Sequence, residues 1–182
     1  MMRVLTGKFK GQTLKRVFSD ETRETSEILK QAVFNSLFDL NDKVFLDLFA
    51  GCGQIGIEAL SRGAKLVYFN DRFLKSEQTV LENLALCKAD KSTFEVKRLD
   101  YLDYLGHITA KGVFFDYIFL DPPFNTNYYK NILYTVKDIL KPNGKVAIEC
   151  KADFEDFSVA GYTLEKSTVY SNKKLLIFQK EN

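Results

Sequence analysis

Two different spacings of hydrophobic residues alternate along this chain. Over residues 24–40, apolar positions recur every three or four residues, which predicts an amphipathic helix. From residue 43, short apolar runs that are typical of strands alternate with further amphipathic stretches. The expected strands are 43–49, 64–69, 93–99, 116–121 and 145–150, the expected helices are 54–63, 76–87 and 127–140, and a turn is expected at 141–144. This alternation favours a mostly parallel sheet with helices on both faces.

Both ends of the chain carry patterns typical of β-structure. Residues 162–170 and 174–180, joined by a short polar turn, predict a hairpin that closes the sheet with one antiparallel strand. Near the start, short β-like pieces around Gly7 and Gly11 predict a small hairpin or an extended arm. No repeat or linker interrupts the chain. We therefore expect a single domain over residues 1–182, with an N-terminal extension at 1–24 and a core at 25–182.

Composition adds little to this picture, but the distribution of charge adds one feature. The 182 residues are 46% hydrophobic and carry a net charge of +2, which is too mild to indicate a nucleic-acid partner. The first 16 residues nevertheless contain no acid and several bases, namely Arg3, Lys8, Lys10, Lys15 and Arg16. A solvated basic arm is the simplest interpretation. The same charges could also neutralise nucleic-acid phosphates.

Cysteine, histidine and hydropathy patterns exclude several classes of protein. Cys52, Cys87 and Cys150 are far apart and form no C-x-x-C pair, which predicts reduced thiols. The single histidine, His107, leaves no basis for a His-based zinc site or a Ser-His triad. No apolar run approaches the roughly 20 residues that cross a bilayer, and the N-terminus lacks a signal-peptide core. We expect a cytoplasmic protein with neither a metal nor a membrane partner.

The segment GCGQIG supplies the first candidate chemistry. Gly51, Gly53 and Gly56 match the G-x-G-x-x-G fingerprint of dinucleotide sites, and Asp71 follows 20 residues after the first glycine. Asp47 precedes the glycines at the expected strand end. A carboxylate there would repel a pyrophosphate, whereas it suits the ammonium and sulfonium of S-adenosylmethionine. From the glycines alone, S-adenosylmethionine, a nicotinamide or flavin, and a purely structural turn all remain open.

The second candidate is Asp121-Pro122-Pro123-Phe124, directly after a very apolar expected strand. In parallel sheets, ligands bind beyond the carboxyl ends of the strands, where this segment falls. Two prolines after an acid fix the backbone and remove two amide donors. The result is a rigid cluster of acceptors with an aromatic side chain, which suits a planar amine attached to a ring. The alternative is a structural turn with Phe124 in the core.

Together these segments resemble the RsmD family of methyltransferases, which act on guanine N2 of bacterial 16S ribosomal RNA. The resemblance rests on FLDLFAGCGQIGIEALSRGA and DYIFLDPPF, and on RVLTGKFKGQTLK, which is similar to the family's opening R-x-x-x-G-x-x-x-G-x-x-L. It also rests on RETSEILKQAVFNSLF, where Arg23, Thr25, Lys30, Gln31, Phe34 and Asn35 match a family segment. The match covers nearly the whole chain and weakens after residue 150. It implies a Rossmann-like class I S-adenosylmethionine-dependent methyltransferase fold, with a mostly parallel seven-stranded sheet, a C-terminal antiparallel hairpin and a short N-terminal β-arm and helix.

The expected site then has three groups of residues. The cofactor S-adenosylmethionine would be bound by Asp47, Phe49, Ala50, Gly51, Gly53, Asp71, Asp100 and Tyr101. The amine would be held by Asp121, Pro122, Pro123 and Phe124, and the RNA by Arg3, Lys8, Lys10 and Arg23. The adenine contact through Asp100 and the Tyr101 amide is implied by the resemblance, and a simple helix cap is the alternative for Asp100.

The sequence departs from the family pattern at two places. Glu24 stands where the family usually has proline. The second strand usually ends in E-x-D, but this chain reads Phe69-Asn70-Asp71, which leaves Asn70 or Asp71 to hold the cofactor ribose.

The expected reaction is methylation of a guanine N2 amine in 16S ribosomal RNA, within a small-subunit particle and by a monomer. The alternatives are an amine methyltransferase acting on adenine N6 of DNA or RNA or on protein glutamine, a nucleotide-binding oxidoreductase, and a non-catalytic binding module.

Overall fold

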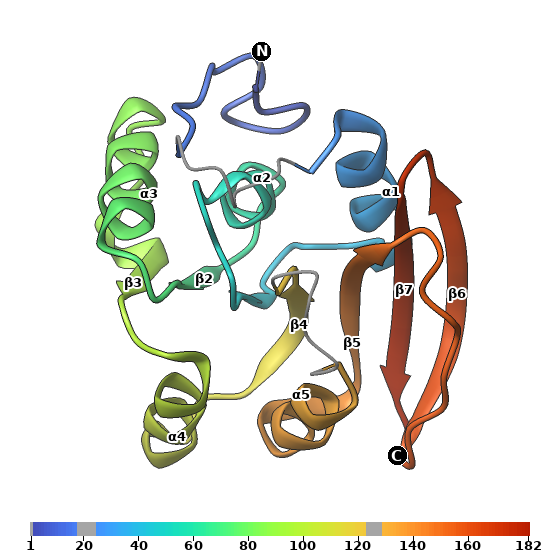
Figure 1. The fold of residues 1–182 in the computed structure, drawn as a ribbon. Helices are drawn as coiled ribbons and strands as arrows, with labels where there is room; N and C mark the ends of the chain where they lie inside the picture. Colours follow the sequence, from blue (N-terminus) through green and yellow to red (C-terminus); the bar gives the residue numbers. More distant parts are fainter. Residues whose placement is uncertain (1, 18–24, 123–128) are drawn as a thin grey trace.

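Seven strands form one mixed sheet in the computed structural model, which describes residues 2–17, 25–122 and 129–182. The strand order is β3-β2-β1-β4-β5-β7-β6 (Figure 1). The parallel strands are β1 (Val44–Asp47), β2 (Leu66–Asn70), β3 (Phe94–Lys97), β4 (Phe115–Leu120) and β5 (Leu140–Lys151). The hairpin strands are β6 (Tyr162–Tyr170) and β7 (Lys173–Lys180), and β7 runs antiparallel to both β5 and β6. The predicted mostly parallel sheet with an antiparallel closing strand is confirmed.

Helices cover both faces of this sheet (Figure 1). One face is covered by α1 (Glu27–Leu37), α2 (Gln54–Ser61) and α3 (Leu74–Leu86), and the other by α4 (Tyr101–Lys111) and α5 (Tyr129–Val136). Short 3-10 turns lie at Lys91–Thr93 and Lys137–Ile139. Alternate strand residues enter different cores: Phe45 packs with the α1–α3 side, whereas its neighbour Leu46 packs with the α4–α5 side. No helix among the described residues is long and apolar enough to cross a membrane.

The N-terminal residues form the predicted hairpin, which lies against α2. Arg3 pairs with Thr13 in an antiparallel bridge, and the Val4 amide donates to the Gln12 carbonyl at 3.0 Å. Gly7 has a positive φ of 86°, and a Cβ there would lie 1.8 Å from the Ser61 carbonyl oxygen. Only glycine therefore fits at this contact between the hairpin and α2.

Glu58 of α2 anchors the hairpin from below. Its side chain is fully buried and accepts hydrogen bonds from the amides of Leu5 at 2.7 Å and Thr6 at 3.0 Å. Lys30 of α1 lies 3.5 Å from Glu58 and donates to the Arg3 carbonyl at 2.6 Å. Burial lowers the pKa of Lys30, and the charge of Glu58 opposes that shift. The hairpin, α1 and α2 thus share one buried ion pair.

The structure corrects two expectations. The predicted turn at 141–144 lies inside β5, because pairing with β4 continues from Leu140 to Lys145 across a register shift. The turn residues form a bulge there, with Asn143 at a positive φ of 58°. Helix α4 was not among the expected helices, although the helix-cap alternative for Asp100 implied a helix start there, and the spacing of Tyr104, Leu105 and Ile108 gives it a buried apolar stripe.

Candidate active site

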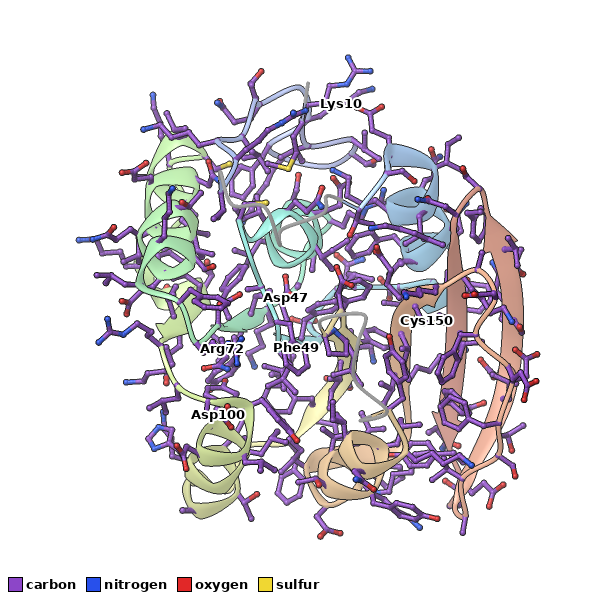
Figure 2. The ribbon with its side chains drawn as sticks, in the orientation of Figure 1. Lys10, Asp47, Phe49, Arg72, Asp100 and Cys150 are labelled. Carbon is purple, nitrogen blue, oxygen red and sulfur yellow. The ribbon has the colours of Figure 1, made fainter. Side chains whose placement is uncertain are left out.

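The predicted site residues follow the carboxyl ends of neighbouring parallel strands. Asp47 ends β1, Asp71 follows β2, Asp100 follows β3 by a short loop, and Asp121 follows β4. Because these strands are parallel, the four carboxylates lie along one edge of the sheet. Figure 2 shows Asp47 and Phe49 near the middle of the view, with Arg72 and Asp100 toward α4 and Lys10 at the outer part of the hairpin.

Two of these acids hold the glycine loop between β1 and α2. The Asp47 carboxylate accepts from the Gly56 amide at 3.0 Å, and the Asp71 carboxylate accepts from the Gly51 amide at 2.9 Å. Gly53 caps the N-terminus of α2, and its amide donates to the Ala50 carbonyl at 2.7 Å. The loop is thus fixed at both ends, with the first turn of α2 beside it.

The third glycine of the motif has a packing role. A Cβ on Gly56 would lie 2.2 Å from the ring of Phe69 in β2. Any other residue at position 56 would therefore prevent α2 from packing this close to the sheet. Phe69, in the place of the family's usual acid, is fully buried beneath α2. Its side chain therefore belongs to the core and not to the cofactor edge.

Of the two remaining ribose candidates, Asn70 is fully engaged by backbone groups. Its side-chain amide donates to the carbonyls of Leu48 at 3.4 Å and Leu99 at 3.2 Å, and its oxygen accepts from the Leu99 amide at 3.2 Å. Asn70 therefore ties the ends of three strands together. Asp71 is the acid at the end of β2, and it also accepts from the Phe73 amide at 3.0 Å.

The pKa of the Asp47 carboxyl lies well above its ordinary value. Its side chain is 1% exposed, and burial raises its pKa to about 7. The hydrogen bond from the Gly56 amide lowers this pKa, while the negative charge of Asp71 raises it. A cationic ligand at this edge would favour the ionised form.

The end of β3 leads into an aromatic contact. Asp100 is exposed and caps α4, accepting from the Leu102 amide at 3.0 Å, as the helix-cap alternative predicted. Tyr101 packs against Phe49, with 5.7 Å between ring centroids and a 43° angle between planes. Two half-buried rings from the β1 and β3 ends therefore meet beside the glycine loop.

The acceptor segment is described only in part. Asp121 and Pro122 follow β4 directly, whereas Pro123 and Phe124 lie outside the described residues. Burial raises the pKa of Asp121 well above its ordinary value. The charge of Glu149 on β5 raises it further, Lys173 on β7 lowers it, and Asp47 raises it.

The basic residues of the hairpin are exposed, and a cavity lies where the hairpin, α1 and α2 meet. Arg3, Lys8 and Lys10 are all exposed, although Arg3 lies 3.4 Å from Glu27 of α1. Arg23 lies outside the described residues. The cavity of about 290 Å³ is lined by, among others, Arg3, Arg16, Lys30 and Gln54. Basic side chains and the first residue of α2 therefore line the same cavity.

Several buried polar residues were not anticipated from the sequence. Glu58 and Ser61 bind the hairpin, and Thr25, Glu149 and Lys173 form a buried cluster near Asp121. A signal existed for Glu149, which is an acid within the apolar run 145–150. In the part of the chain that the structure describes, no three His, Cys, Asp or Glu side chains are grouped as a metal ion would require.

The strand order, the antiparallel β7 and the glycine loop after β1 define the class I S-adenosylmethionine-dependent methyltransferase fold. Within this class, the chain belongs to the family described as Conserved hypothetical protein 95, which matches residues 2–179.

Individual relatives span almost the whole chain. YlbH of Bacillus subtilis is 34% identical over 183 residues, covering 98% of this chain and 99% of its own. The ribosomal RNA small subunit methyltransferase D of Haemophilus influenzae is 32% identical over 172 residues, covering 92% of this chain and 89% of its own. The solved structure of yhhF from Escherichia coli superposes with a TM-score of 0.83 at 25% identity, covering 98% of this chain and 97% of its own.

Proposed function

We propose that this protein transfers a methyl group from S-adenosylmethionine to the exocyclic N2 amine of a guanine in 16S ribosomal RNA. The observation that carries the proposal is the position of Asp121-Pro122 at the end of β4, on the same sheet edge as the glycine loop. The relative from Haemophilus influenzae, named as a small-subunit methyltransferase, supports the choice of RNA. The protein acts as a monomer on a small-subunit particle.

The cofactor is bound by residues of the β1, β2 and β3 ends. The ionised Asp47 faces the ammonium, and the amides that begin α2 receive the carboxylate. Asp71 holds the ribose hydroxyls, because Asn70 is committed to Leu48 and Leu99. Asp100 and the Tyr101 amide hold the adenine beside the Phe49 ring. S-adenosylmethionine supplies an electrophilic methyl group on its sulfonium.

The acceptor amine is activated by position. The guanine amino group is a poor nucleophile because its lone pair is delocalised into the ring. The Asp121 carboxylate and the Pro122 carbonyl accept its two hydrogens, which favours pyramidal geometry at nitrogen and exposes the lone pair. Since attack needs near-linear alignment of nitrogen, methyl carbon and sulfur, positioning supplies much of the acceleration. The positive charge that develops on nitrogen meets acceptors already in place.

The target nucleotide leaves its stack before it reaches this edge, and Phe124 stacks on the base. Phosphates on the approaching RNA are held by the exposed charges of Arg3, Lys8 and Lys10, together with Arg23. The cavity between the hairpin and α1 adds Arg16 to this basic surface.

The test uses small ribosomal subunits from cells that lack this methyltransferase. The subunits are incubated with the protein and methyl-labelled S-adenosylmethionine, and the RNA is digested to nucleosides. We expect label in N2-methylguanosine with the native protein. We expect no label with Asp121→Ala, although this variant should still bind the cofactor, as measured by calorimetry.

Other outcomes redirect the proposal. Label in another nucleoside keeps the enzyme class and discards the guanine. Absence of label with intact cofactor binding discards the assembled subunit and turns the test to free RNA, DNA and protein glutamine. A protein that binds no S-adenosylmethionine overturns the proposal altogether.

A further inference from the structure

The acceptor edge contains a second acid beside Asp121. Phe119 of β4 and Ala147 of β5 are register partners, and both pack in the core under α1 and α2. Side chains alternate along a strand, so the residues two positions further along point to that same side. Those residues are Asp121 and Glu149. Glu149 therefore lies on β5 and Asp121 directly after the neighbouring β4, toward the same face of the sheet.

Glu149 is fully buried and held by side chains from two distant segments. One carboxylate oxygen forms an ion pair with the ammonium of Lys173, at the start of β7. The other accepts from the hydroxyl of Thr25, just before α1, at 2.7 Å. Lys173 is itself 6% exposed. This buried cluster of Thr25, Glu149 and Lys173 has no role in the cofactor contacts described above.

The charges that surround Asp121 come from every neighbouring element. Asp47 of β1, Glu149 of β5 and Lys173 of β7 act on it electrostatically, and so do the Tyr129 hydroxyl of α5 and the Cys150 thiol of β5. In the described part of the chain, Lys173 forms an ion pair with Glu149, and its positive charge also acts on Asp121. Neighbouring carboxylates oppose one another's ionisation, and the positive charge of Lys173 offsets part of that repulsion.

We propose that Glu149 and Lys173 are positioning residues, a buried ion pair that sets the pH range in which Asp121 can take a proton from the substrate amine. This inference rests on the proposed function and adds to it the residues that control the proton acceptor. Thr25 fixes the pair by binding the second oxygen of Glu149. Neither Glu149 nor Lys173 touches the reacting atoms.

The protonation state of Asp121 matters because methyl transfer leaves a proton that must be removed. As the new N–C bond forms and the C–S bond breaks, the sulfur keeps the bonding electron pair and becomes a neutral thioether. The amine nitrogen is left with a positive charge, which it loses by giving one proton to the Asp121 carboxylate. That proton then passes to solvent and the carboxylate is restored. An Asp121 that is protonated beforehand cannot take this proton.

The test is the pH dependence of methyl transfer in a single turnover on small ribosomal subunits, between about pH 5 and pH 9. Glu149→Gln removes a negative charge beside Asp121, so the acid limb of the profile should move to lower pH. Lys173→Met removes the positive charge, so that limb should move to higher pH. Each displacement should be on the order of one pH unit.

Two further variants separate electrostatics from folding. Lys173→Arg keeps the charge and should keep the native profile. The double variant Glu149→Gln with Lys173→Met removes one charge of each sign, so its limb should return toward the native position even if Lys173→Met alone is too unstable to assay. Circular dichroism and cofactor affinity confirm that each assayed variant is folded.

The outcomes distinguish this inference from the function on which it rests. Opposite displacements of the two limbs support it. Rates that fall in Glu149→Gln and in the double variant with unmoved limbs overturn it and leave the cluster a purely structural role. Native protein that methylates no subunit RNA means that the proposed function has failed first.

Discussion

The two halves of the candidate active site hold their acids in different ways. In the cofactor half, each carboxylate accepts from a backbone amide: Asp47 from Gly56, Asp71 from Gly51, and Asp100 from Leu102. In the acceptor half, the buried Glu149 is held by side chains instead, from residues 24 and 124 positions away in the chain. The partner of an amide-held acid belongs to the backbone, so no side-chain substitution removes it, although the Asp71–Gly51 bond also depends on the pairing of β1 with β2. Side-chain-held acids depend on how the whole sheet is ordered, and their ionisation depends on a partner that a single mutation can remove.

The largest effect is expected from the acceptor half. Asp121→Asn keeps the shape of the side chain but cannot take a proton, so the single-turnover rate should fall by roughly 10²- to 10³-fold. Affinity for S-adenosylmethionine should change little, because Asp121 lies outside the cofactor contacts. The matched control is Asp103→Asn, an exposed acid in the first turn of α4, which should keep the native rate. A rate reduction that appears only as weaker cofactor binding would place Asp121 in the cofactor half.

In the cofactor half, a substitution should weaken cofactor binding and leave the rate of methyl transfer nearly unchanged. Asp71→Ala removes the proposed ribose ligand and the acceptor of the Gly51 amide, so affinity for S-adenosylmethionine should fall by about tenfold or more. The rate at saturating cofactor should stay within a few-fold of native. Calorimetry and single-turnover kinetics on one preparation check both quantities.

Asn70→Ala is the comparison for Asp71. It removes the side-chain partner of one buried and two partly buried backbone groups, so it should lower the free energy of unfolding by about 1–3 kcal/mol in urea. Cofactor affinity that falls more in Asn70→Ala than in Asp71→Ala would exchange the roles assigned to these neighbours.

Asp47 gives the cofactor half its own pH dependence. Since burial raises its pKa to about 7, the free protein carries a neutral carboxyl below that pH. Cofactor affinity should therefore fall roughly tenfold for each pH unit below about 7, and Asp47→Asn should flatten this slope. The free energy of unfolding depends on pH in the opposite direction. Because the pKa of Asp47 is higher in the native than in the unfolded protein, its contribution to stability is fully present below the unfolded pKa and is lost as pH rises through about 7. Calorimetry and urea unfolding across this range measure the two slopes.

The smallest effect is expected at the hairpin. Replacing Arg3, Lys8 and Lys10 together by alanine should weaken RNA binding and reduce the slope of log affinity against log salt by about one unit for each phosphate that is no longer neutralised. Lys65→Ala, an exposed lysine at the amino end of β2, should leave that slope unchanged. An unchanged slope in the triple variant removes the hairpin from the RNA-binding surface.

The same contrast explains what the sequence could predict. Strand ends, the glycine loop and the acids beside them follow from short-range patterns, and the predicted sheet and closing hairpin were confirmed. The segment at 141–144 was predicted as a turn because Pro and Gly are typical of turns. The structure keeps it in β5 as a bulge, since pairing with β4 on both sides outweighs the local preference.

Long-range polar pairs could not be predicted in this way. The buried acid in the run 145–150 indicated that Glu149 needs a partner, but spacing alone does not reveal that Thr25 and Lys173 supply it. That meeting requires the strand order β4-β5-β7 and the packing of α1 above it. The choice between Asn70 and Asp71 as the ribose ligand could not be made from the sequence either. Only the structure shows that the Asn70 side chain is hydrogen-bonded to Leu48 and Leu99.

The anchoring of the hairpin by Glu58 sets a fixed distance within the molecule. Helix α2 begins at the glycine loop, and its later residues Glu58 and Ser61 carry the hairpin. At 1.5 Å per residue, this helix is a rigid spacer of about 10 Å. If the hairpin holds a phosphate and the loop holds the methyl donor, as proposed, the distance between the two is therefore constant. Under the proposed function, this fixed distance helps to select the nucleotide to be methylated. The nucleotide must lie at the right distance along the RNA from the phosphate that the hairpin binds, and it must carry the right base.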